Sequence, residues 1–389
     1  MSDNINNEDT DFLIKGKKSK ILEILKLEKG EKSYTYRKII LLSLVLWMPM
    51  LILTFIENTA ISGSIRIPFL YDYVVYARFL IAIPILFLTE RTIEFQTNNT
   101  IRYFLDSGII ADNNIEDFQN NFTKLFKLRH SRILKAIILI FAYIVVFKFW
   151  KSLDRNYIAA SWITGKGEAE LSYAGYWYFF LAAPLYHFVL YLLICKYLLW
   201  ALFMWKISRM KLNLFPTNSD FTAGLGFLGY SLVSFAFIGS AQSSVFSGEI
   251  ANRITFMGET LGDNRIIIIG SVLVLTFIYF FPALFFIRKL FRTKLKGILE
   301  YGVLTSKQSN AFFQKYLKNK YDEFLDTGDF SSLTDLNTSY DVIQQMRTVP
   351  IETRKVIIMM LIISAPYAPL LLLAFPADVI FEFILKFFV

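Results

Sequence analysis

Apolar residues are gathered into seven long blocks, separated by shorter stretches that are rich in charged and polar residues. Runs of about 18 or more apolar residues are typical of membrane-spanning helices, because roughly 20 residues at 1.5 Å each cross the hydrocarbon core. The pattern therefore predicts about seven spans. In chain order they are Ile39–Ile56, Val74–Thr89, Ile133–Trp150, Trp177–Cys195, Leu225–Val245, Ile266–Ile287 and Val356–Ala374.

Three features interrupt this simple pattern. Arg78 lies inside the second block, near one of its ends. Pro366 and Pro369 break the seventh block, which indicates a kink or, less commonly, a half-helix binding site. The last apolar piece, Val379–Val389, is too short to cross a bilayer, so we expect it to lie along the interface or to pack back onto the bundle.

The composition also argues for a membrane protein. The 389 residues are 55% hydrophobic and 17% aromatic, with only 19% charged residues and a mean hydropathy of +0.45. A soluble domain could not keep so much apolar surface away from water. The polar N-terminal residues lack the apolar core of a cleaved signal peptide. We therefore predict an all-α, polytopic helical membrane protein.

Lys and Arg are distributed unevenly over the segments between the spans. If the N-terminus is cytoplasmic, about 30 of the 41 Lys and Arg lie inside and about six outside, the bias expected of membrane proteins. We therefore expect a cytoplasmic N-terminus, an external C-terminus and a location in the cell (inner) membrane. The net charge of +9 would then face the lipid bilayer, and a nucleic-acid partner is not expected.

The same arrangement divides the chain into four regions. Amphipathic stretches at residues 100–132 and 196–212 predict a layer of cytoplasmic helices beneath the bundle. The regions are a basic cytoplasmic segment at 1–38, the membrane bundle of spans one to six at 39–290, a cytoplasmic helical segment at 291–354, and span seven with the apolar C-terminus at 355–389.

One polar stretch, Gly328 to Ile351, lies just before the seventh span. The order Ser332-Leu-Thr-Asp335 has the form of a capping box, with aspartate in place of the usual glutamate. Apolar residues then recur at steps of three and four, which predicts one face of a helix that ends near Pro350. These residues are Leu333, Leu336, Tyr340, Ile343 and Met346.

A second motif, "PTNSDFTAGLGFLG", begins at Pro216. Together the two motifs resemble His-Pro-Asp…Gly-Gly-Leu-Gly-Phe-Leu-Gly and Ser-Leu-x-Asp-Leu…Met-Arg-x-Val-Pro of bacterial multi-spanning membrane proteins of unknown function. The resemblance implies a related fold and a bacterial membrane, but no activity. Asn218 and Ser219 replace the family's His-Pro, and Ala223 its first glycine. The matching residues are Asp220, Gly224, Leu225, Gly226, Phe227, Leu228, Gly229, Ser332, Leu333, Asp335, Leu336, Ser339, Met346, Arg347, Val349 and Pro350.

Small residues form a stripe along the fifth predicted span. They allow helix backbones to approach closely in lipid, and the packing interpretation is the commoner one. The serines and Gln242 could instead line a hydrated path. The pore or polar-cavity candidates are therefore Ser240, Gln242 and Ser243, together with His187 of span four. The stripe itself consists of Gly229, Ala236, Ser240, Ser243 and Ser247.

Three ionisable positions are open to more than one interpretation. His187 is either part of a proton relay or a neutral imidazole that bonds to a neighbouring carbonyl or tyrosine. Asp220 either complements a helix dipole or forms an inner gate with Arg347. Pairing of Arg78 with Glu57 would lower the cost of burying either charge.

Enzyme chemistry has little support in this sequence. It contains no G-x-S-x-G, H-E-x-x-H, P-loop or G-x-G-x-x-G motif. The single cysteine, Cys195, excludes a disulfide framework, and two histidines argue against a histidine-built metal site. We expect no catalytic residue, no metal and no cofactor.

Three functions are compatible with these features. The polar stripe, the broken seventh span and His187 favour a channel or transporter for a small solute or ion. The helix Leu333–Met346 and the basic residues from Arg288 to Lys320 favour an assembly or signalling protein that docks a cytoplasmic partner. A lipid-modifying enzyme that uses Asp220, Asp335 or His187 has the least support. Homo-oligomerisation is left open.

Overall fold

The computed structural model describes residues 34–61, 65–152, 161–164, 171–318 and 327–374. These residues form helices joined by short loops, and no β-strand lies among them. Two isolated β-bridges, Ile67 with Ser161 and Ile110 with Leu212, fasten loops outside the helices. Most of the predicted segment 1–38 and the apolar piece Val379–Val389 lie outside the described residues.

The helices fall into long elements and short connecting ones. The long helices are α2 (Tyr34–Ile56), α4 (Ile83–Asp106), α5 (Ile115–Arg129), α6 (Arg132–Ser152), α9 (Ala183–Arg209), α10 (Leu228–Asn252), α11 (Arg265–Phe280), α12 (Ile287–Phe312), α13 (Thr327–Gln345) and α14 (Thr353–Ser364). The short α-helices are α3 (Tyr73–Tyr76), α8 (Tyr173–Trp177) and α15 (Leu370–Ala374). Short 3-10 or π-helical segments join several of them: η2 (Ala77–Ala82), η4 (Tyr178–Ala182), η6 (Phe281–Phe286), η7 (Phe313–Lys318) and η8 (Ala365–Tyr367).

Each of the seven predicted spans coincides largely with helix, although α10 begins only at Leu228 and a turn at Ala368 and Pro369 interrupts the seventh span. By length and composition, five continuous helices could cross a membrane: Ile39–Ile56, Tyr73–Asp106, Tyr173–Arg209, Arg265–Tyr316 and Thr353–Leu373. A sixth is added if α5 and α6, which meet at a bend of 50°, count as one broken span. The chain is therefore an all-helical, multi-pass membrane protein, while the number seven stays a prediction.

Among the seven predicted spans, the fifth is covered by α10, a helix that is not one of these candidates. It has 25 residues, long enough to cross a bilayer, but its serines, glycines and Gln242 dilute its apolar character. It packs against α4, α11 and α14, and most of its side chains are buried by them. A helix enclosed by other helices needs no apolar face toward lipid, so its low hydropathy is compatible with a central position.

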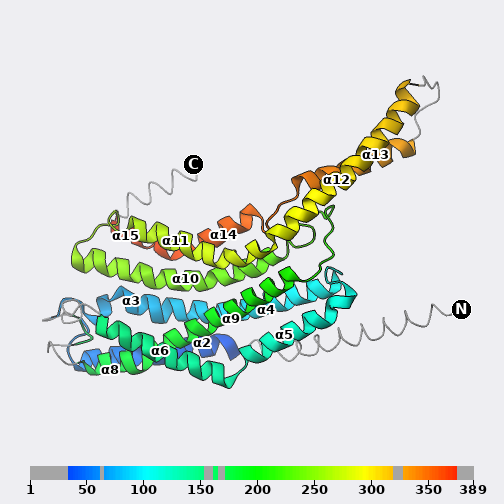
Figure 1. Ribbon diagram of the computed structural model, residues 1–389. Helices are drawn as coiled ribbons and strands as arrows, with labels where there is room; N and C mark the ends of the chain where they lie inside the picture. The colour runs from blue at the N-terminus through cyan, green and yellow to red at the C-terminus, as the bar shows by residue number, and fades with distance from the viewer. Residues whose placement is uncertain (1–33, 62–64, 153–160, 165–170, 319–326, 375–389) are drawn as a thin grey trace.

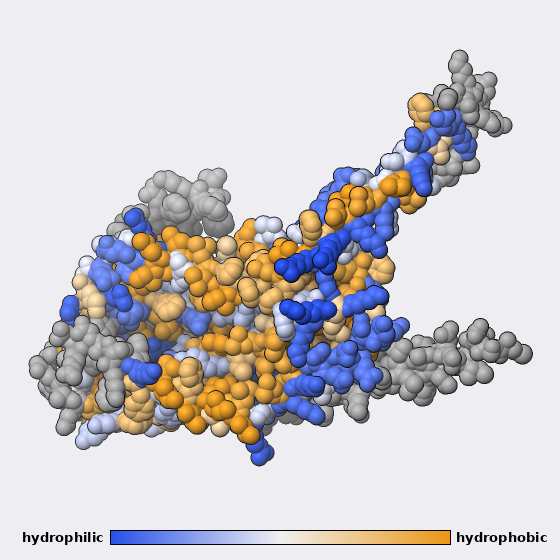
Figure 2. Space-filling view, viewed as in Figure 1, coloured by the Kyte–Doolittle hydropathy of each residue, from blue (hydrophilic) through white to orange (hydrophobic). Residues whose placement is uncertain are grey.

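The surface has the distribution expected of a bundle embedded in lipid. Figure 2 shows hydrophobic side chains over the middle of the bundle and hydrophilic ones toward its two ends. Large apolar side chains are widely exposed on the long helices, among them Leu41, Ile133 and Ile266 at 64%, 74% and 76%. Exposed apolar area of this extent is incompatible with a monomer surrounded by water.

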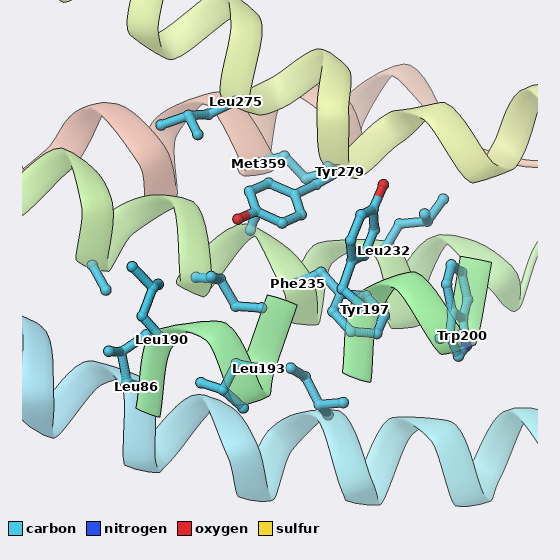
Figure 3. Close-up of a cluster of buried hydrophobic side chains, with 14 of the residues drawn as sticks. Leu86, Leu190, Leu193, Tyr197, Trp200, Leu232, Phe235, Leu275, Tyr279 and Met359 are labelled. Carbon is cyan, nitrogen blue, oxygen red and sulfur yellow. The ribbon is translucent and has the colours of Figure 1, made fainter. Parts of the chain in front are cut away.

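The core lies between α4, α9, α10, α11 and α14. Figure 3 shows Tyr197 and Trp200 of α9, Phe235 of α10 and Tyr279 of α11 meeting in one cluster. The aromatic rings of Tyr197 and Phe235, and those of Tyr197 and Tyr279, are 5.2 Å apart between centroids. Aromatic pairs at this separation add to the packing energy of the core.

The small residues of α10 permit close helix packing. A Cβ at Gly248 would lie 2.9 Å from the carbonyl oxygen of Tyr73, and one at Gly239 would lie 3.0 Å from Tyr279. Ser231 forms a hydrogen bond of 2.5 Å with Thr100 of α4. The five residues of the predicted stripe are all buried, so the stripe faces protein, as the packing interpretation requires; they are Gly229, Ala236, Ser240, Ser243 and Ser247.

The loops at the end of the bundle opposite Asp220 are held by the buried carboxylate of Asp72. The predicted ion pair of Arg78 with Glu57 is not found among the described residues. Asp72 accepts hydrogen bonds from the indole of Trp162 at 2.9 Å and the amide of Asn252 at 2.8 Å. Glu57 accepts from a backbone N–H at 2.7 Å. The Arg78 guanidinium instead donates to the hydroxyl of a tyrosine in η4.

A helical hairpin projects from the bundle (Figure 1). It consists of α12 with η7, and α13, and we call it the arm; apart from the first four residues of α12 it falls within the predicted cytoplasmic segment 291–354. The capping-box prediction fails in detail. The chain is already helical at Thr327, so Ser332 and Asp335 lie inside α13, where Ser332 accepts a hydrogen bond of 2.7 Å from Gln308 of α12. The helix ends at Gln345, five residues before Pro350.

Candidate functional site

The loop Pro216–Phe227, which joins α9 to α10, is organised by one carboxylate. Asp220 accepts four hydrogen bonds from its own loop: from the backbone N–H and hydroxyl of Thr222, both at 2.7 Å, from Gly224 N–H at 3.0 Å and from Gly226 N–H at 2.8 Å. Such bonds satisfy backbone donors that no helix satisfies here. We call this segment the Asp220 loop.

The loop requires three residues with left-handed backbone. Phe221, Ala223 and Gly224 have φ angles of 55°, 53° and 94°. The left-handed region costs a residue with a Cβ roughly 1–2 kcal/mol. Ala223 is the position where the resembled family has glycine. Asn218, where that family has histidine, uses its side-chain oxygen to accept from Asp220 N–H at 3.1 Å.

Arg347 joins the Asp220 loop to the segment that follows α13. Its backbone N–H donates to the carbonyl of Phe221 at 2.7 Å, and its guanidinium donates to the backbone carbonyl of Asp220 at 2.9 Å. The predicted pairing of Asp220 with Arg347 is thus made through the main chain, while the Asp220 carboxylate is used inside its own loop. This leaves the carboxylate as an organiser of backbone.

Lys355, at the start of α14, binds the other end of the loop. Its ammonium donates to the carbonyl of Gly226 at 3.3 Å and lies 3.9 Å from the ring centroid of Tyr230. A Cβ at Gly229 would lie 2.7 Å from Cδ of Lys355, so a larger residue there would require the lysine side chain to shift. Sequence reasoning missed Lys355, because it is one of many basic residues flanking a span.

The base of the arm completes this cluster. A Cβ at Gly297 of α12 would lie 2.8 Å from Pro216, and the ammonium of Lys294 donates to the carbonyl of Met346 at 2.7 Å. The joint, as we call it, comprises Asp220, Gly229, Lys294, Gly297, Arg347 and Lys355. It ties α10, α12, α13 and α14 together where the arm leaves the bundle.

Only some residues of the two sequence motifs, the one at Pro216 and the one between Gly328 and Ile351, lie close together in the structure. Arg347 and the neighbouring Pro350, which is buried, belong to the joint region, as do Gly224, Gly226 and Gly229. Ser332, Asp335 and Ser339 lie out on the arm instead. The Ser339 hydroxyl donates to the carbonyl of Asp335 at 2.9 Å, within the same helix.

The arm carries an exposed apolar ridge. Four side chains of α12 recur at intervals of four residues, so they line one side of the helix. They are Phe291, Leu295, Leu299 and Val303, with exposed fractions of 55%, 48%, 63% and 57%. A parallel row of exposed basic residues lies beside this ridge, namely Arg288, Arg292 and Lys296.

The pore candidates lie inside the bundle. Ser240 and Ser243 of α10 are buried, and Gln242 accepts a hydrogen bond of 3.5 Å from the hydroxyl of Tyr279. His187 donates to the carbonyl of Ala183, one turn earlier in its own helix, at 2.8 Å. None of the three principal pockets of the described residues is lined by these four candidates.

The described residues contain no group of three or more His, Cys, Asp or Glu side chains that could hold a metal ion. A depression at the joint is lined by Asp220, Arg347, Glu352 and Arg354 among others, so it offers both carboxylates and guanidinium groups.

No protein-family model, curated protein or solved structure matches this chain.

Proposed function

We propose that this membrane protein is an assembly or signalling component whose arm docks a partner protein beside the bilayer. The observation that carries the proposal is the apolar ridge of α12. An exposed apolar stripe that water surrounds marks an interaction surface. Leu299 and Val303 lie 12 and 16 residues beyond Ile287, or about 18 and 24 Å along the helix from the end of the predicted span.

The side chains around the ridge favour one class of partner. The apolar ridge and the basic row of Arg288, Arg292 and Lys296 run side by side along α12. An amphipathic helix with an apolar face and a neighbouring acidic face complements both rows. We therefore propose an acidic amphipathic helix as the occupant.

The joint supports this function because it fixes where the arm points. The Asp220 loop, Lys294 and Lys355 connect the arm to α10 and α14 through hydrogen bonds of 2.7–3.3 Å. A docking arm held in this way presents its surface at a defined height and angle. The resemblance to a bacterial membrane family and the distribution of Lys and Arg support the part of this proposal that puts the arm in the cytoplasm, below an inner membrane.

Site-directed photocrosslinking in the native host tests the proposal. A photoreactive phenylalanine analogue at position Leu299 or Val303 should crosslink one soluble protein, and the same probe at the exposed, polar Ser309 should not. The double variant Arg292→Glu, Lys296→Glu should abolish that crosslink. Crosslinking of lipid only, of a second copy only, or with equal yield from all three positions would contradict the docking function.

A channel or transporter is the second candidate, and one observation favours it. The guanidinium of Arg78 is held inside the bundle, 5.6 Å from the ring centroids of both Tyr178 and Tyr186, and its Nε is buried without a hydrogen-bond partner. Ionisable groups at such depth often belong to solute pathways. Flux into liposomes containing the purified protein should then fall with Gln242→Leu, and an unchanged flux would remove the α10 pore.

A further inference from the structure

A pocket of about 150 Å³ opens where α5 bends into α6, against α4 and α9. One wall is apolar and consists of Leu134, Ile138, Leu192 and Leu199. The other wall is ionic, with carboxylates from α4 and cations from α5, α6 and α9.

The ionic wall is a built network. Lys196 of α9 forms ion pairs with Glu90 and Glu94 of α4, the latter at 3.3 Å, and Arg129 of α5 pairs with Glu94. The side chains of Lys196 and Arg129 are only 14% and 13% exposed, whereas those of Glu90 and Glu94 are 41% and 32% exposed. The carboxylates are therefore the more accessible members of the network.

Lys135 of α6 adds a third cation at the rim. Its ammonium forms no ion pair among the described residues, and its side chain is exposed. The pocket thus offers three cations and two carboxylates to one ligand. A ligand that satisfies both kinds of charge carries an anion and an ammonium within a few ångström of each other.

The pocket lies where a bilayer headgroup would lie. Lys196 follows Tyr173 by 23 residues of continuous helix, about 35 Å at helical rise, which is roughly the thickness of the hydrocarbon core. Next to the apolar wall, Ile133, Ile137 and Leu198 are exposed at 74%, 56% and 58%. A ligand whose charged end enters the pocket can therefore lay apolar chains along this surface.

We propose that the pocket binds the headgroup of a phospholipid from the surrounding bilayer. The phosphate lies against Lys135 and Arg129, and a primary ammonium lies against Glu90. A phosphoethanolamine headgroup has this combination of charges. Phosphatidylcholine has the same net charge, but its quaternary ammonium has no N–H to donate to a carboxylate.

Native mass spectrometry of the full-length protein in detergent tests this site. Phosphatidylethanolamine should bind at least several-fold more tightly than phosphatidylcholine or phosphatidylglycerol. Lys135→Gln should weaken that binding several-fold, whereas Arg132→Gln, an equal loss of charge three residues away and outside the pocket lining, should leave it unchanged. Glu90→Gln should remove the preference for phosphatidylethanolamine over phosphatidylglycerol.

Four results would overturn the proposal. Equal binding of phosphatidylcholine, or tighter binding of phosphatidylglycerol, would remove the ammonium site at Glu90. Equal losses in Lys135→Gln and Arg132→Gln would indicate diffuse attraction of the basic surface. Soluble glycerophosphoethanolamine that binds as tightly as the lipid would identify a site for free phosphate esters. Lys135→Gln and Arg132→Gln should both melt at the wild-type temperature, because both side chains are exposed.

Discussion

Ala223 has a backbone conformation that is unfavourable for alanine. Its φ angle of 53° lies in the left-handed region, and it is buried. Ala223→Gly should therefore raise the free energy of unfolding by about 0.5–1 kcal/mol, since the relief of strain exceeds the entropic cost of glycine. Thermal unfolding of the purified protein in detergent measures this gain.

Ala236→Gly is the matched control for that prediction. Ala236 is also buried, but it lies in the middle of α10, where glycine is unfavourable by about 0.5–1 kcal/mol. The two substitutions should thus shift the melting temperature in opposite directions. A loss of stability in both would mean that the left-handed backbone at Ala223 carries no strain.

Asp220 stabilises the loop through bonds that no other side chain replaces. Asp220→Ala removes four acceptor contacts and leaves the N–H groups of Gly224 and Gly226 without a partner. Hydrogen bonds to charged groups contribute roughly 1.5–3 kcal/mol each and are not additive, so we expect a loss of about 3 kcal/mol. Hydrogen exchange at Arg347 N–H should rise as well, because its acceptor is Phe221 of the same loop.

Asp341→Ala is the control for Asp220→Ala. Asp341 is exposed on α13, and its removal should change stability by less than about 0.5 kcal/mol. An equal loss in both variants would show that the Asp220 loop is not the element that holds the joint.

The sequence could identify Asp220 and its glycines as special, but it could not show why. Asp220 and Gly226 are close together in the sequence, so a helix cap or a structured loop can be expected there. The contact with Arg347 joins residues 127 positions apart, and it uses a backbone carbonyl that has no sequence signature. Lys355 was missed for the same reason, since its partners are a carbonyl and a ring face.

At the scale of helices, two glycines in neighbouring helices differ in the space around them. A Cβ at Gly248 of α10 would lie 2.9 and 3.0 Å from the backbone of α3, whereas a Cβ at Gly270 of α11 would meet nothing within 4 Å. Gly248→Ala should cost about 1–3 kcal/mol through overpacking. Gly270→Ala should raise stability by about 0.5–1 kcal/mol, because alanine favours the helix.

Melting temperatures of the two variants distinguish the roles proposed for α10. If Gly248→Ala is as well tolerated as Gly270→Ala, the small residues do not serve close packing. Gly248, which follows Ser247 of the stripe, would then be a candidate for the lining of a hydrated path. Solute flux measured on the same two preparations would show which function the glycine serves.

The sequence predicts where the long helices lie, but it does not predict the residues at which they begin and end. Each of the seven apolar blocks is largely helical, because long apolar runs leave the backbone in lipid no other way to satisfy its hydrogen bonds. The capping motif at Ser332 misled, since tertiary packing against α12 extends α13 toward Thr327 and uses the serine hydroxyl for Gln308. The ridge on α12 has a four-residue period from Phe291 to Val303 in the sequence, but basic residues surround it and make this helix amphipathic only in part.

At the scale of the whole molecule, the arm and the loop between α10 and α11 lie at opposite ends of the bundle (Figure 1). Sequence alone predicted which segments are polar, while the projection of the arm depends on the long-range contacts of the joint. The distribution of Lys and Arg predicts that the arm faces the cytoplasm, because basic loops are retained on that side.

Cysteine labelling in intact cells tests this sidedness. In a Cys195→Ser background, Thr260→Cys lies in the exposed loop between α10 and α11, and Ser309→Cys lies exposed on the arm. A membrane-impermeant maleimide should label Thr260→Cys in intact cells and Ser309→Cys only after permeabilisation. The reverse pattern would place the arm outside, where no cytoplasmic partner can reach its ridge. Labelling of both positions from one side would mean that α11 does not cross the bilayer.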